Sequence, residues 1–124
     1  MNDNVDSVSA AIDRIQIDME QIASGREDPY KAGWRIWGEA FALAAESGEL
    51  LWPMWLQWGA LTDWVELKPS EAEQANDAMR RAAREWLIVA DDPSRHRSYF
   101  ERWLYEELGC PRPAAQSADS GTAS

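Results

Sequence analysis

Large apolar residues recur every three or four positions along most of this chain, and this period constrains the fold more than any other feature. The clearest example lies near the start, where one stripe of a helix would hold Val5, Val8, Ile12, Ile15, Met19 and Ile22. Gly25 follows this stripe, and glycine favours the left-handed turn that ends many helices. We therefore predict a helix over about residues 5–24.

Two more helices are predicted by an aspartate that precedes a proline. In Asp28-Pro29 and Asp92-Pro93 the aspartate would cap the free amides, and proline fits the first helical position because its missing N–H has no partner there anyway. Glycines at positions 48 and 109 would end these helices. The pattern predicts helices over 29–48 and 93–109.

Two prolines predict the limits of a third helix, and a capping motif predicts the start of the helix that follows it. Pro53 and Pro69 limit a helix over 53–67. Ser70 and Glu73 have the spacing of a capping box, in which each side chain accepts from the other residue's amide. Since no stretch alternates apolar and polar residues with period two, we predict an all-α fold: an irregular four- to five-helix bundle with a Trp-rich central helical hairpin.

Domain organisation follows from where the apolar residues stop. The helical pattern covers 1–110, which we predict to be a single helical domain, and 124 residues suit one hydrophobic core. The sequence PRPAAQSADSGTAS at 111–124 contains no large apolar residue. We predict a disordered C-terminal tail, because such a segment buries too little surface to order itself.

Eight tryptophans in 124 residues are the most unusual feature of the composition. Tryptophan at helical spacing usually fills a core, but the helices at 29–48 and 53–67 are apolar on two opposite faces, more than three neighbours would cover. We predict that the surplus faces bind a partner, since exposed apolar patches mark contact sites. The candidate interaction residues are Ile36, Leu43, Trp52, Trp55, Leu56 and Trp64.

Charge excludes several classes of partner. Twelve basic and 22 acidic residues give a net charge of −10, which argues against binding nucleic acid phosphates. The longest uncharged run, 50–62, is too short to span a membrane. Because the first residues lack the pattern of a secretory signal, we expect a cytoplasmic protein. We also expect the arginines of the last two helices to pair with the acidic first helix, within one chain or between subunits.

Residues for catalysis or for cofactor binding are scarce. One histidine, His96, and one cysteine, Cys110, cannot supply the several imidazoles or thiolates of most metal sites. His96 is expected to bond to the Asp92 cap, and a thiol after a helix C-terminus is a poor nucleophile. We therefore predict a non-enzymatic protein with no cofactor and no metal.

Three functional hypotheses remain open at this point. The favoured one is a helical interaction module that self-associates as a homo-oligomer or docks a protein partner through its surplus apolar faces. A second is a peripheral protein that lays Trp52-Pro53-Met54-Trp55 on a membrane or another apolar surface. A third is an acidic inhibitor or immunity-type protein that binds a basic partner by charge complementarity.

Overall fold

A computed structural model describes residues 3–44 and 50–110, and within these ranges the chain forms helices and turns but no strand. The all-α prediction is confirmed. The elements are α1 (Asp3–Ala23), α2 (Pro29–Leu43), α3 (Leu51–Leu67), the short η1 (Pro69–Glu71), α4 (Ala72–Val89), η2 (Pro93–Arg95), α5 (His96–Glu101) and the π-helical η3 (Arg102–Glu107). The predicted tail at 111–124, the end of the second helix at Gly48 and the side chain of Val5 lie outside the described residues.

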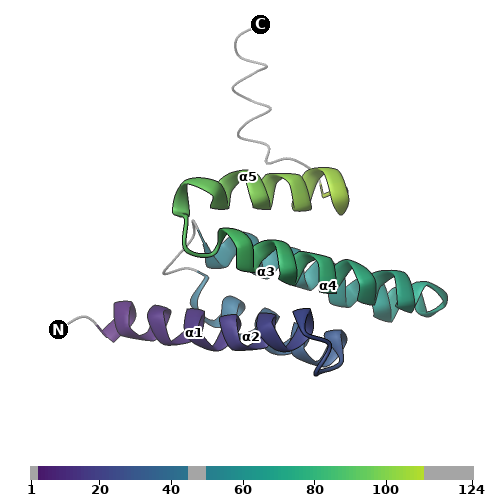
Figure 1. Ribbon diagram of the computed structural model, residues 1–124, viewed down its shortest axis with the longest axis horizontal. Helices are drawn as coiled ribbons and strands as arrows, with labels where there is room; N and C mark the ends of the chain where they lie inside the picture. The colour runs from purple at the N-terminus through teal and green to yellow at the C-terminus, as the bar shows by residue number, and fades with distance from the viewer. Residues whose placement is uncertain (1–2, 45–49, 111–124) are drawn as a thin grey trace, which may run out of the picture.

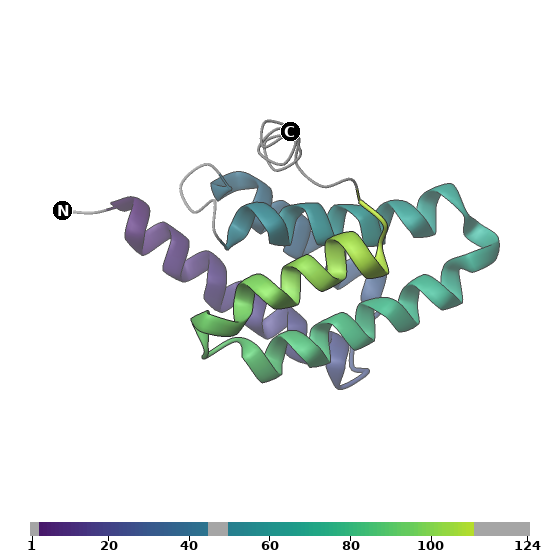
Figure 2. The same ribbon diagram turned by 90° about the horizontal axis from the view of Figure 1, so that it is seen from above.

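The helices form a bundle of three levels, with α1 and α2 on one side, α3 and α4 in the middle and α5 on the other side (Figure 1). Viewed from above, α5 crosses the pair formed by α3 and α4 (Figure 2). The most extensive helix contact joins α2 to α3, and α1 packs on both α2 and α4. The Trp-rich hairpin therefore forms as predicted, with α3 at the centre of the bundle.

Most predicted helix ends occur where the sequence places them. The Asp28 side chain accepts from the amide of Lys31 at 3.1 Å, and Asp92 accepts from the amide of Ser94 at 3.2 Å. Gly25 and Gly109 have φ angles of 76° and 69°, the left-handed conformation that glycine adopts at low energetic cost. These local signals are reliable because each depends on neighbours within one turn.

The capping box at Ser70 is a wrong prediction. Ser70 lies inside η1, and α4 begins at Ala72 with Glu71 at its cap position and no side-chain hydrogen bond to the cap. The Glu71 carboxylate instead accepts from the indole N–H of Trp64 at 2.7 Å. A tertiary hydrogen bond and the turn after Pro69 thus replace the local motif.

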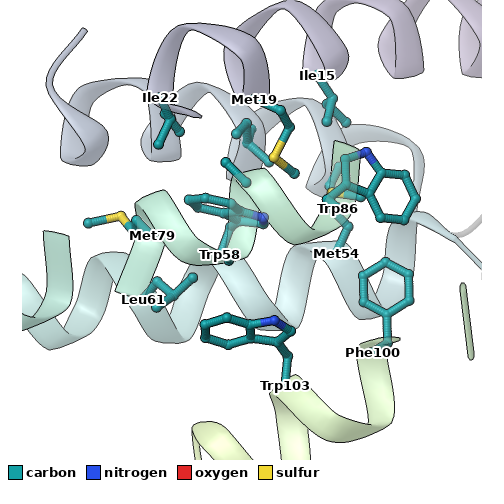
Figure 3. Close-up of a cluster of buried hydrophobic side chains, with 14 of the residues drawn as sticks. Ile15, Met19, Ile22, Met54, Trp58, Leu61, Met79, Trp86, Phe100 and Trp103 are labelled. Carbon is teal, nitrogen blue, oxygen red and sulfur yellow. The ribbon is translucent and has the colours of Figure 1, made fainter. Parts of the chain in front are cut away.

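The hydrophobic core lies between the three levels and surrounds Trp58 (Figure 3). Figure 3 shows Trp58 between Met19 of α1, Met79 of α4 and Leu61 of its own helix. Trp86 and Trp103 are buried as well, so three of the eight tryptophans fill the core. The stripe predicted for the first helix is confirmed, since Ile15, Met19 and Ile22 are buried with α1 facing this core.

The hydroxyl of Tyr99 is buried in the core with hydrogen-bond partners. The Tyr99 hydroxyl donates to the carbonyl oxygen of Ala82 at 2.9 Å and accepts from the Gln57 side-chain amide at 2.9 Å. Burial raises the pKa of Tyr99 well above that of an exposed phenol. This hydrogen-bonded group links α3, α4 and α5, because a buried hydroxyl needs partners.

Small residues allow α2 to approach its neighbours closely. A Cβ on Gly33 would lie 3.2 Å from side-chain atoms of Met79, Thr62 and Trp58, whereas a Cβ on Gly38 would meet nothing within 4 Å. Both glycines lie inside α2. The pair therefore separates the effect of packing from that of helix propensity.

We expect Gly33→Ala to lower the free energy of unfolding by about 1–2 kcal/mol, because an extra methyl group overpacks this contact. Gly38→Ala should raise it by about 0.5–1 kcal/mol, since alanine loses less backbone entropy in a helix. Urea denaturation of both variants measures the difference. Equal effects would mean that α2 does not pack against α3 and α4 at Gly33.

Among the side chains that the structure describes, no ion pair joins the first helix to the arginines of the last two helices as predicted. Arg81 bonds to Glu107 at 3.1 Å, and Arg102 bonds to Glu85 and Glu107. These arginines of α4 and η3 therefore pair with glutamates of the same two elements. The acidic first helix instead bonds to α2, where Arg35 bonds to Asp18 at 2.9 Å. α1 packs on α4 as well as on α2, but its ion pairs, Arg35–Asp18 and Arg14–Glu39, are both with α2.

Asp18 is the buried carboxylate of this network, and Arg35 also bonds to Glu27. Burial raises the pKa of Asp18, an effect that the hydrogen bond and charge of Arg35 only partly oppose. The same guanidinium lowers the pKa of Glu27. Removing Arg35 would therefore leave a buried carboxylate without its counter-charge.

We expect Arg35→Met to lower the free energy of unfolding by about 1–2 kcal/mol near neutral pH, because the unpaired Asp18 charge is costly to bury. Because the pKa of Asp18 is raised in the fold, the ionised carboxylate destabilises the fold at pH values above that pKa. The stabilisation that Arg35 gives to Glu27 is lost as pH falls and the Glu27 carboxylate is protonated. Both effects make the penalty shrink toward about pH 3, where the carboxylates are protonated. Denaturation of wild type and variant across this range measures it, and a penalty independent of pH would contradict the assignment.

Candidate interaction surface

The six predicted interaction residues separate into three groups in the structure. Ile36 is 0% exposed and belongs to the core, so it is not available to a partner, and Leu43 packs half-buried against the same core. Trp64 is half-buried and donates its indole N–H to the carboxylate of Glu71. The other three, Trp52, Trp55 and Leu56, lie on α3 and come together at one surface.

The surplus face of α2 is the opposite one from that predicted. Its buried stripe consists of the small or aliphatic residues Pro29, Ala32, Gly33, Ile36 and Ala40. Its aromatic stripe points outward, with Trp34 43% exposed and Phe41 55% exposed. The correction has a steric reason: small residues let α2 approach α3 and α4 closely, and the large rings then remain outside.

Outward-facing rings of α2 and α3 form one continuous row, which we call the aromatic ridge. It consists of Trp34, Trp37, Phe41, Trp55 and Trp52. Successive ring centroids are 5.1, 5.3, 5.6 and 4.7 Å apart along this order. These separations lie within the range in which aromatic rings attract one another, so each ring restricts the side-chain conformation of the next.

The core supports the ridge from below. Trp37 and Trp55 are half-buried and pack against the hydrophobic core, whereas Trp34, Phe41 and Trp52 are about half exposed. Gly59 makes room for one of the anchoring rings, because a Cβ there would lie 3.1 Å from Cδ1 and Nε1 of Trp37. The ridge is therefore an ordered apolar surface.

A groove of about 490 Å³ runs along one side of the ridge, and we call it the aromatic groove. Trp34, Trp37 and Trp55 line it from the ridge, and Leu56 extends its apolar wall. Cys110, the last described residue, lies at the same groove. Its volume is within the range of small-ligand sites, but its open shape suits an extended chain better than an enclosed molecule.

The charged residues of the groove are acidic. Asp63 and Glu66 line it, and none of its lining residues is a lysine or an arginine. Glu66 accepts from the hydroxyl of Tyr30 and from the indole N–H of Trp34, the latter at 3.2 Å. The hydrogen bond to Glu66 raises the pKa of Tyr30. These bonds fix Glu66 beside the ridge, where its negative charge can attract a cationic group.

His96 and Cys110, the residues considered for catalysis, make packing and backbone contacts. His96 does not bond to Asp92 as predicted; its Nε2 lies 3.0 Å from the carbonyl oxygen of Ala90, and its ring packs on Trp86. Burial raises the pKa of the Cys110 thiol, which disfavours the reactive thiolate. Across residues 3–44 and 50–110, no three histidines, cysteines or carboxylates gather as a metal site would require.

The fold and this surface define an all-α protein with an exposed aromatic ridge. No helix within the described ranges has the length and apolar character needed to cross a bilayer. Comparison with protein-family models, with curated proteins and with solved structures finds no match to this chain. The surface of the protein is therefore the basis for proposing its function.

Proposed function

We propose that the protein is a helical interaction module that docks a segment of a partner protein on the aromatic ridge and in the aromatic groove. The observation that carries the proposal is the exposure of Trp34, Phe41 and Trp52 in a row anchored on a complete core. Rings of this size contribute most to binding when a partner removes them from water. Because the row is already ordered, binding it costs little conformational entropy.

Charge favours a partner that differs from the chain itself. The groove is lined by Asp63 and Glu66 and the chain carries a net charge of −10. A second copy would bring the same carboxylates to the contact, and like charges oppose such pairing. A segment with apolar and basic residues would satisfy both the rings and the carboxylates.

The same observations weaken the two alternatives. A membrane-binding surface usually has basic residues beside its tryptophans, and the lining of the aromatic groove has none. An acidic inhibitor would bind through its carboxylates, and those of Glu27, Glu85 and Glu107 are already held by arginines.

Peptide-display selection on the full chain tests the proposal. The ridge variant is Phe41→Ser with Trp52→Ser, because both rings are exposed and neither ring hydrogen-bonds to another described residue. The matched control is Ile88→Ser, which removes an exposed apolar side chain from α4. Peptides enriched on the wild type should bind the ridge variant at least about tenfold more weakly and the control equally well.

Two outcomes would contradict the proposal. One is that the enriched peptides bind the ridge variant as tightly as the wild type. The other is that the wild type sediments with phosphatidylcholine–phosphatidylglycerol vesicles whereas the ridge variant does not, which would favour the peripheral-membrane alternative. Sedimentation velocity on wild type and ridge variant tests self-association in the same way.

A further inference from the structure

We propose that the segment Pro111-Arg112-Pro113 of this same chain lies in the aromatic groove, where it competes with any partner segment. The first observation is continuity: Cys110 lines the groove, and the segment follows it directly in the sequence. Little chain has to be closed into a loop, so the entropic cost of reaching the groove is small. The inference concerns the surface of the proposed function but does not require a partner.

The chemistry of the segment matches the rings. Proline pre-forms the extended left-handed helix that aromatic grooves bind, and its flat apolar ring packs on indole faces. Two prolines separated by one residue occur here, while Trp34, Trp37 and Trp55 line the groove. The lack of large apolar residues in 111–124 is no obstacle, because the domain supplies the apolar surface.

Charge gives an independent match. Arg112 is the only basic residue in 111–124, and it lies between the two prolines. The groove offers the carboxylates of Asp63 and Glu66 and no cation. An arginine held between two ring contacts would thus meet negative charge, and a guanidinium also packs well on an indole face.

The test uses the full chain and the indole N–H signals of a ¹H–¹⁵N NMR spectrum. Arg112→Glu should release the segment, and the signals of Trp34, Trp37 and Trp55 should shift while those of the buried Trp58 and Trp103 stay. Asp119→Asn, a charge change elsewhere in the tail, is the matched control and should leave all five signals in place. Adding Asp63→Arg to Arg112→Glu should return the signals toward their wild-type positions, because the pair is restored with reversed charge.

A competition measurement gives the magnitude. A synthetic peptide of sequence PRPAAQSA should bind the Arg112→Glu chain at least about threefold more tightly than the wild-type chain, because a tethered segment competes at an effective millimolar concentration. A PEPAAQSA peptide should bind neither. Equal binding of PRPAAQSA to both chains, or binding to neither, would overturn the proposal.

Two further results distinguish this proposal from docking on a second copy and from the proposed function. Indole signals that shift with protein concentration in the wild type would mean that the segment docks on a second copy, which overturns the intramolecular assignment. If Arg112→Glu shifts nothing but displayed peptides still need Phe41 and Trp52, the proposed function stands and the tail proposal fails.

Discussion

Replacing Trp58 with alanine is expected to lower the free energy of unfolding by about 4 kcal/mol, a large part of the stability of a domain of this size. Trp58 is fully buried and lies where α1, α3 and α4 meet (Figure 3). Alanine would leave a cavity that three helices can fill only by moving. No described residue accepts a hydrogen bond from the Trp58 indole N–H, so the loss is one of packing.

Trp52→Ala is the matched control for this prediction. The same change at a ring that is 48% exposed should cost about 1 kcal/mol or less, because its main described contact is the neighbouring Trp55 ring. Guanidinium denaturation followed by circular dichroism measures both variants. A loss at Trp52 as large as that at Trp58 would mean that the ridge is part of the core.

Ile36→Glu should be the most damaging single change on α2, lowering the free energy of unfolding by more than about 4 kcal/mol. Ile36 is 0% exposed, and a carboxylate there would be buried among apolar side chains. Phe41→Glu lies on the opposite face of the same helix. It should cost about 1 kcal/mol, mainly through the loss of the stacked contact with Trp37.

Far-ultraviolet circular dichroism at increasing temperature compares the two glutamate variants. Ile36→Glu should lose the helical signal at much lower temperature, whereas Phe41→Glu should stay helical but lose the binding selected on the wild type. A folded Ile36→Glu variant together with an unfolded Phe41→Glu variant would mean that α2 is rotated relative to this description. The pair is sensitive to orientation because both residues lie on one helix.

The helices themselves could be predicted from the sequence because their signals are local. Asp28 and Asp92 cap amides within three residues, and Gly25 and Gly109 adopt the conformation that only glycine favours. The buried stripe of α1 was equally clear, and Ile15, Met19 and Ile22 of this stripe are buried. Fold class depends on this level of information and was predicted correctly.

The candidate surface was only partly predictable, because a helix with two apolar faces does not say which face is buried. Ile36 was selected for the outer face of α2, but the helix buries it together with Ala32 and Ala40. The rings of Trp34 and Phe41 are exposed instead. The overlooked signal is the run of small residues, which marks a close approach between helices. Trp52 and Leu56 on α3 are exposed and Trp55 and Leu56 line the aromatic groove, so their role in binding stays a prediction.

Long-range polar contacts were the least predictable part. The carboxylate of Glu71 bonds to Trp64 and that of Glu66 to Trp34, and neither pair is marked by any sequence motif. Arg35 pairs with Asp18 because α1 and α2 are adjacent, a fact of topology. Such contacts depend on how helices pack, and the period of apolar residues does not encode it.

Solvent exposure of the indole N–H groups tests most directly the central claim that surface and core tryptophans are separate. A soluble paramagnetic agent should strongly broaden the ¹H–¹⁵N indole signal of Trp52 in the full chain and spare those of Trp58 and Trp103, after assignment by single Trp→Phe variants. The pattern should not change on dilution, because the ridge of a single chain is open to solvent. Protection of Trp52 equal to that of Trp58 would contradict the account, since the ridge would then be covered.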